Sequence, residues 1–146
     1  MTNQDKKQWL GRYLSLKREI VALDRERERI MSLGTKITPT YSDMPHGGSG
    51  EDKIQSAVDK LTGIAEQMDS KAADMRQSLV EIEVAIENVP QENLRELLRR
   101  RYICGERFEE IAVHMHYNYR WVQRLHGIAI ENIETKQAVS SRAVRC

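Results

Sequence analysis

The chain is poor in the residues that fill a large globular core. Phe, Trp and Tyr make up 5% of its 146 residues, with a single Phe among them, while charged residues reach 31% and apolar residues 40%. A composition with few aromatics and many Glu, Lys, Arg, Leu, Ile and Ala residues is typical of long helices that pack along narrow seams. The length allows one ordinary domain or two small ones.

Cysteine, secretion signals and membrane segments are also scarce or missing. The two cysteines, Cys104 and Cys146, form no CxxC pair, so we expect free thiols and neither a disulfide framework nor a zinc site. No signal peptide and no run near the ~20 apolar residues of a membrane span is readable. We therefore expect a cytoplasmic protein with no membrane partner.

The motifs of catalysis are missing as well. The sequence has no phosphate-binding loop, no paired carboxylates in a pocket-forming context and no nucleophile beside a base. His114 and His116 lie two positions apart, but a metal site needs more ligands than these. We expect a protein that is not an enzyme and that holds neither a cofactor nor a metal.

Charge is distributed unevenly although the net charge is only +1. Residues 1–90 carry 13 basic and 15 acidic residues, a net charge of −2, whereas residues 91–146 carry 10 basic and 7 acidic residues, a net charge of +3. The basic excess thus lies in the C-terminal part, where it would favour a nucleic-acid partner.

Two long helices are predicted before Pro90. The first spans about residues 3–32 and ends near Gly34, and a seam in steps of four and three runs along it through Trp9, Tyr13, Leu16, Ile20, Leu23, the polar Arg27 and Ile30. The second begins near Ser49, whose hydroxyl can cap it, and repeats the same alternation: Ile54, Val58, Leu61, Ala65, Met68, Ala72, Met75, Leu79, Ile82, Ile86 and Val89.

A proline- and glycine-rich loop, about residues 33–50, joins these helices, and we expect them to fold back as an antiparallel, coiled-coil-like hairpin over residues 1–89. The loop is either a partner-binding element or a disordered tip. Placing Ile30 opposite Ile54 puts Trp9 opposite Met75. Four residues are then left without a partner on the first helix: Leu79, Ile82, Ile86 and Val89. We expect them to pack on the C-terminal part or on a second copy of the chain, unless the register slides and the first helix covers them.

Residues 90–134 predict a three-helix domain that contains a helix-turn-helix, followed by a flexible tail over residues 135–146. The helices are expected at Gln91–Tyr102, Phe108–Met115 and Tyr119–Ile133. Ala112 is the small residue where two helices cross, and His116 stands where the turn needs a left-handed conformation. Asn118 is a strong N-cap for the third helix. Its inward side is predicted to hold Val122, Leu125, Ala129 and Ile133.

The opposite face of that third helix is the predicted DNA-reading face. Arg and Gln are the side chains that read guanine and adenine edges in the major groove. The predicted reading face consists of Arg120, Gln123, Arg124 and Gly127. Asn118 and Tyr119, at the start of the helix, and Arg107 before it are expected to contact phosphates, together with the run Arg99–Arg101. The alternative is that this face is simply solvated. Trp121 and Cys104 are expected to pack inside.

Part of this segment resembles region 4 of bacterial sigma factors. The resemblance lies in the run from Arg101 to Ala112 (RYICGERFEEIA) and the run from Val122 to Ile130 (VQRLHGIAI), and it covers about 45 residues. The whole chain is similar to small phage and prophage proteins of Gram-positive bacteria, in the style of the ArpU and RinA late-gene regulators. The resemblance implies promoter-type DNA binding and leaves a contact with RNA polymerase open. His116 replaces the usual Gly, and no sigma region 2 is recognisable.

Three functions are therefore in view. The first is a sequence-specific transcription regulator that binds double-stranded DNA, with a homodimer through the hairpin as an open question. The second is a phage DNA-packaging adaptor of the small-terminase kind, although such adaptors usually place the DNA-binding unit first. The third is a coiled-coil interaction protein that binds no DNA.

Overall fold

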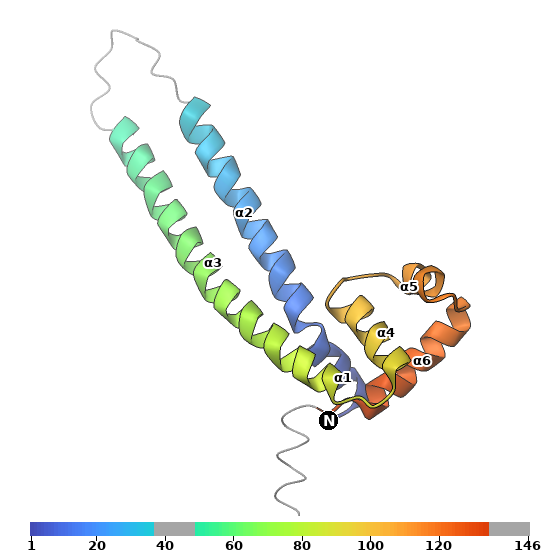
Figure 1. Ribbon diagram of the computed structural model, residues 1–146. Coiled ribbons are helices and arrows are strands. Elements are labelled where there is room, and N and C mark those ends of the chain that lie inside the picture. Colours follow the sequence, from blue (N-terminus) through green and yellow to red (C-terminus); the bar gives the residue numbers. More distant parts are fainter. Residues whose placement is uncertain (37–48, 135–146) are drawn as a thin grey trace, which may run out of the picture. The chain divides into compact units, whose positions relative to one another are not determined.

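The computed structural model describes residues 1–36 and 49–134, and all regular elements in this part of the chain are helices (Figure 1). Its helices are α1 (Asn3–Leu10), α2 (Arg12–Lys36), α3 (Ser49–Glu87), α4 (Glu92–Tyr102), α5 (Phe108–Met115) and α6 (Tyr119–Asn132). The predicted all-α class is confirmed for these residues. No helix in the described ranges has the length and apolar character needed to cross a lipid bilayer.

The chain divides into two compact units. Unit 1 combines Met1–Ser15 with Met75–Cys146, and unit 2 is Leu16–Asp74. Unit 1 therefore takes residues from both sides of Pro90, and α1 shares it with α4, α5 and α6. The predicted tail, 135–146, and most of the predicted loop, 37–48, lie outside the described residues.

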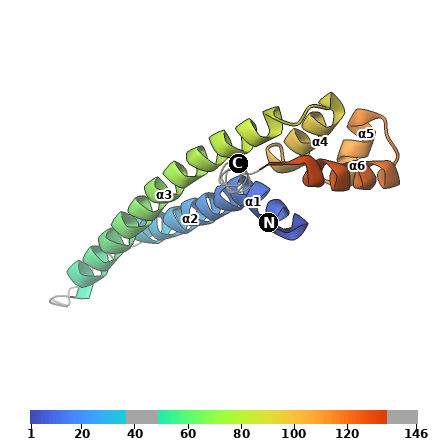
Figure 2. The ribbon, with the colours of Figure 1, turned by 90° about the horizontal axis from the view of Figure 1, so that it is seen from below.

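In unit 2, residues 16–36 of α2 and 49–74 of α3 run side by side in both views (Figures 1 and 2). The Lys71 ammonium pairs with the Glu19 carboxylate at 2.7 Å. The predicted register sets Glu19 opposite Ala65, six positions from Lys71, so that register is wrong. A heptad pattern selects the face that packs, but shifting one helix by whole turns preserves that face.

The apolar seam of α3 is covered unevenly. Ile54 is 62% exposed and Val58 48% exposed, and the buried residue of this stretch is Ile64, which the predicted seam omits. The seam predicted for this helix is therefore only partly buried in this stretch. A single facing helix covers only part of an apolar stripe, since burial of a stripe this long needs neighbours on both flanks.

Glycine positions also differ from the prediction. The first helix is interrupted at Gly11, which ends α1, whereas α2 continues past Gly34 to Lys36. Glycine costs a helix interior only about 1 kcal/mol, so its effect depends on the surrounding packing. Leu10, directly before the break at Gly11, is fully buried in the core of unit 1.

The core of unit 1 gathers side chains from α1, α3, α4, α5 and α6. Of the four residues predicted to lack a partner on the first helix, Ile82, Ile86 and Val89 are buried in the same cluster as Leu97, Leu98, Ile111 and Ile130. Leu10 from α1 joins this cluster, with Trp9 and Tyr13 packed against it. The expected packing on the C-terminal helices is therefore confirmed for these three residues.

Candidate nucleic-acid interface

The turn between α5 and α6 has a backbone conformation that the sequence predicts. His116 adopts the left-handed conformation, with φ 59° and ψ 39°, and is the single non-glycine residue with a positive φ in the described part of the chain. The Tyr117 N–H then donates to the Ala112 carbonyl at 2.9 Å. Ala112 is 8% exposed. The small side chain and the left-handed residue together allow α6 to turn back across α5.

The start of α6 is capped by a side chain. The Asn118 Oδ1 accepts a hydrogen bond from the Trp121 N–H at 2.8 Å, and Asn118 itself has extended backbone angles. An N-cap of this kind satisfies one of the orphan N–H groups of the first turn and stabilises a helix by about 1 kcal/mol. The remaining free N–H groups of this turn favour an anion near the helix start.

One face of α6 is buried against α4 and α5. The four predicted inward residues, Val122, Leu125, Ala129 and Ile133, are all buried, and two further residues share their side of the helix: His126 and Ile130. Sequence reasoning missed His126 because a polar ring in a core depends on a partner far along the chain.

That partner is Tyr102 on α4. The Tyr102 hydroxyl and the His126 Nε2 are 2.7 Å apart, and the Phe108 ring meets the imidazole edge-on at a centroid distance of 5.0 Å. Burial lowers the pKa of His126 to about 4, with smaller contributions from the positive charges of Lys7 and Arg101. Burial raises the pKa of Tyr102 to about 12. A neutral imidazole and a neutral phenol therefore share this hydrogen bond at pH 7.

The opposite face of α6 is open. All seven predicted DNA-binding residues are exposed: Arg107, Asn118, Tyr119, Arg120, Gln123, Arg124 and Gly127. The Gln123 Nε2 donates to the Tyr119 hydroxyl at 2.8 Å, which orders both side chains along the helix. Within the described residues, neither Arg120 nor Arg124 makes an ion pair.

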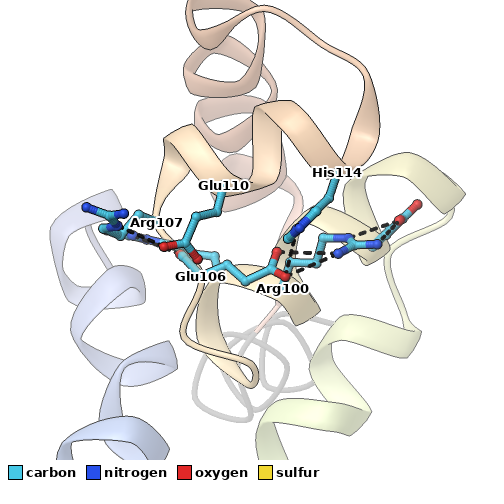
Figure 3. A network of polar contacts seen from close by, with 7 residues as sticks. Arg100, Glu106, Arg107, Glu110 and His114 are labelled. Carbon is cyan, nitrogen blue, oxygen red and sulfur yellow. Dashed lines mark hydrogen bonds and ion pairs between the residues drawn. The ribbon is translucent and has the colours of Figure 1, made fainter.

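The arginines of α4 and the α4–α5 connection are instead largely paired with carboxylates. Figure 3 shows Arg107 beside Glu110, at 2.9 Å, and Arg100 beside Glu106, at 3.2 Å. Arg100 also pairs with Glu96, and Arg99 pairs with Glu87. The hydrogen bond from Arg107 lowers the pKa of Glu110. A phosphate contact by any of these arginines would have to displace or share a carboxylate.

Two side chains do not lie where the sequence placed them. Trp121 is 40% exposed and Cys104 is exposed, so the expectation that both pack inside is wrong. Trp121 directly precedes the buried Val122 on α6, and the 100° step of a helix turns it away from the core. Cys104 lies between the end of α4 and the left-handed Gly105, in a connection that stays at the surface.

The described residues hold no group of three or more His, Cys, Asp and Glu side chains that could bind a metal ion. Comparison of the chain with protein-family models, with curated proteins and with solved structures finds no match.

Proposed function

We propose that the protein is a cytoplasmic, sequence-specific transcription regulator of the phage or prophage type, and that α5, the His116 turn and α6 act as a helix-turn-helix. In this proposal α6 is the recognition helix and enters the major groove of double-stranded DNA. One observation carries the proposal: α6 buries one face and presents on the other Arg120 and Arg124, neither of which pairs with a carboxylate of the described residues. A helix held in this way has a fixed outward face, which direct readout of bases requires.

The chemistry of the outward face fits base edges. Each arginine can donate two parallel hydrogen bonds to guanine O6 and N7, and Gln123 can pair with adenine N6 and N7. A Cβ added to Gly127 would meet nothing within 4 Å, so its importance would lie in the approach of DNA and not in internal packing. Asn118, Tyr119 and the N–H groups at the start of α6 are assigned to phosphates.

The transcriptional role comes from the resemblance to sigma factor region 4. In that region a helix-turn-helix of this kind binds promoter DNA, and we assign the same target here. A pull-down of RNA polymerase with the tagged protein, in the presence of its selected DNA, tests the associated polymerase contact.

We further propose that the two long helices form an antiparallel hairpin that pairs with a second copy of the chain. A groove of about 950 Å³ in unit 2 lies between α2 and α3, and its apolar lining includes Ile30, Met31, Leu33, Ile54, Val58 and Leu61. The same groove is bordered by charges of both signs on both helices: Glu26 and Arg29 on α2, Asp52 and Lys53 on α3. In a two-fold dimer the same surface of both copies meets. Because the border of the groove carries charges of both signs, acidic residues of one copy can face basic residues of the other.

Selection of bound duplexes from a random DNA library tests the main proposal. The wild-type chain should enrich one sequence, and the double variant Arg120→Ala/Arg124→Ala should lose that preference while its circular dichroism spectrum stays helical. Removing one bidentate contact costs about 1–3 kcal/mol of discrimination. The matched control, Arg18→Ala/Arg25→Ala, removes the same charge from exposed positions of α2 and should keep the preference.

Other results would point to the other functions. Enrichment that survives Arg120→Ala/Arg124→Ala would show that this face does not read DNA. A ring of many copies in light scattering would favour a DNA-packaging adaptor. The absence of any mobility shift at low salt, with either selected or random DNA, would favour a coiled-coil interaction protein.

A further inference from the structure

A second cationic feature of unit 1 lies beside the buried His126. It is a pocket of about 470 Å³ whose lining comes from four helices: Lys7, Arg101, Tyr102, Phe108, Gln123 and His126. Lys7 belongs to α1 and Gln123 to α6, so the pocket joins the first helix of the chain to the proposed recognition helix.

The pocket is electropositive. Two of its six lining residues are basic and none is acidic. Neither Lys7 nor Arg101 makes an ion pair with any described residue. The nearby Glu106 carboxylate is already engaged by Arg100 at 3.2 Å and by the His114 ring at 3.0 Å. The charges of Lys7 and Arg101 also disfavour the protonated form of His126, which is a second sign of their field.

Arg101 is held in place by two contacts that leave its charge uncompensated. Its Nη1 donates to the Glu106 backbone carbonyl at 3.2 Å. Its guanidinium carbon lies 4.1 Å from the centre of the Phe108 ring. A guanidinium fixed over an aromatic face loses little further entropy when it binds an oxyanion, and the flexible lysine opposite adds a point charge.

We propose that this pocket is a phosphate subsite of the DNA interface, in which Lys7 and Arg101 hold one backbone phosphate at the flank of α6 marked by Gln123. This inference rests on the proposed DNA binding. It adds α1, which precedes the helix-turn-helix by about a hundred residues in the sequence, to the DNA-contacting surface. The chemistry is that of a tetrahedral oxyanion, so a free phosphate is the competing occupant.

The test compares Lys7→Gln with Lys17→Gln, a matched control that removes an exposed lysine from α2. Binding to the selected duplex and to a random duplex is measured by fluorescence anisotropy over a series of salt concentrations. Lys7→Gln should weaken both complexes by the same factor, about three- to tenfold, because a phosphate contact carries no sequence information. The double variant Lys7→Gln/Arg101→Gln should reduce the slope of log K against log salt by about 0.9, the value for one phosphate.

Thermal melting of each variant verifies that unit 1 stays folded. If the double variant unfolds because of Arg101→Gln, the single variant Lys7→Gln decides the test. Equal affinities for Lys7→Gln and Lys17→Gln would overturn the subsite while leaving the Arg120 and Arg124 assignments intact. Loss of sequence preference in Lys7→Gln would also overturn it, because the residue would then read bases.

Titration with inorganic phosphate separates the two sources of the anion. For the DNA subsite, millimolar phosphate should shift the NMR signals of His126 only weakly, and the selected duplex should displace it. The opposite outcome has two parts: phosphate shifts the His126 NMR signals strongly and Lys7→Gln abolishes that shift, while Lys7→Gln leaves the affinity for DNA unchanged. This result would assign the pocket to a free phosphate and overturn the inference.

Discussion

Acidification should destabilise unit 1, because His126 is buried in its neutral form. The loss of stability should begin at a higher pH than the protonation of carboxylates. The imidazole Nε2 shares a hydrogen bond with the Tyr102 hydroxyl at 2.7 Å, and the Phe108 ring meets the imidazole edge-on. Burial is the main reason that its pKa falls from 6.5 to about 4. In the unfolded chain the same ring takes up its proton near the ordinary pKa.

The sign and size follow from this difference. Between pH 6.5 and about 4 the unfolded state binds a proton that the folded state does not, so the free energy of unfolding falls as the pH falls through this window. Each pKa unit is worth about 1.36 kcal/mol. The full shift of the His126 pKa, from 6.5 to about 4, corresponds to about 3 kcal/mol, and solvent screening of a partly accessible ring reduces the expected loss to about 2 kcal/mol.

Urea denaturation followed by circular dichroism, at pH values from 7.5 to 4, measures this loss. His126→Gln is the comparison, because an amide can keep a hydrogen bond to the Tyr102 hydroxyl and does not titrate. The wild-type free energy of unfolding should fall by about 2 kcal/mol more than that of His126→Gln across the window. Parallel pH curves for the two proteins would refute the reasoning, since they would mean that His126 takes up its proton without unfolding.

Three further changes test the fold around the proposed interface. Asn118→Ala removes the cap of α6 and should lower the free energy of unfolding by about 1 kcal/mol in urea denaturation, with Asn118→Asp as the control that keeps the cap. His116→Val places a β-branched residue at a positive φ and should cost about 1–2 kcal/mol, whereas His116→Gly should be neutral or stabilising; equal melting temperatures would contradict the strained turn. Ile54→Lys should leave the melting temperature of the dilute protein unchanged but shift sedimentation velocity toward the monomer, and an unchanged dimer would exclude the unit 2 groove as its interface.

The elements that the sequence predicts well are those set by local chemistry. The bounds of α5 agree with the prediction, and the left-handed His116 and the capping Asn118 were both expected. Each depends on residues within one turn of it: a residue type that tolerates a positive φ, or an oxygen that reaches the N–H three positions on. The buried Ala112 follows from the same short spacing.

The elements that the sequence does not predict depend on distant partners. The imidazole of His126 is buried because Tyr102, 24 positions away, supplies a hydroxyl. The pairing of Lys71 with Glu19 fixes a register that the heptad repeat leaves open. Arg99 looked free in the sequence, but the Glu87 carboxylate of α3 pairs with it. Arg100 pairs with Glu106, which lies in the connection between α4 and α5. No pattern within one segment brings Lys7 beside Arg101.

The burial of Leu10 has a consequence for the order in which the protein can fold during synthesis. Leu10 leaves the ribosome before some of its core partners, because its cluster also contains Ile130 and Ile133, which follow it by more than a hundred residues. At about 5–20 residues per second, α1 waits roughly 6–25 s for these partners. Contacts of such long sequence separation also slow folding once the chain is complete. During that interval the apolar side of α1 is open to chaperones and proteases, so substitutions at Leu10 should reduce the amount of protein in cells more than its equilibrium stability suggests.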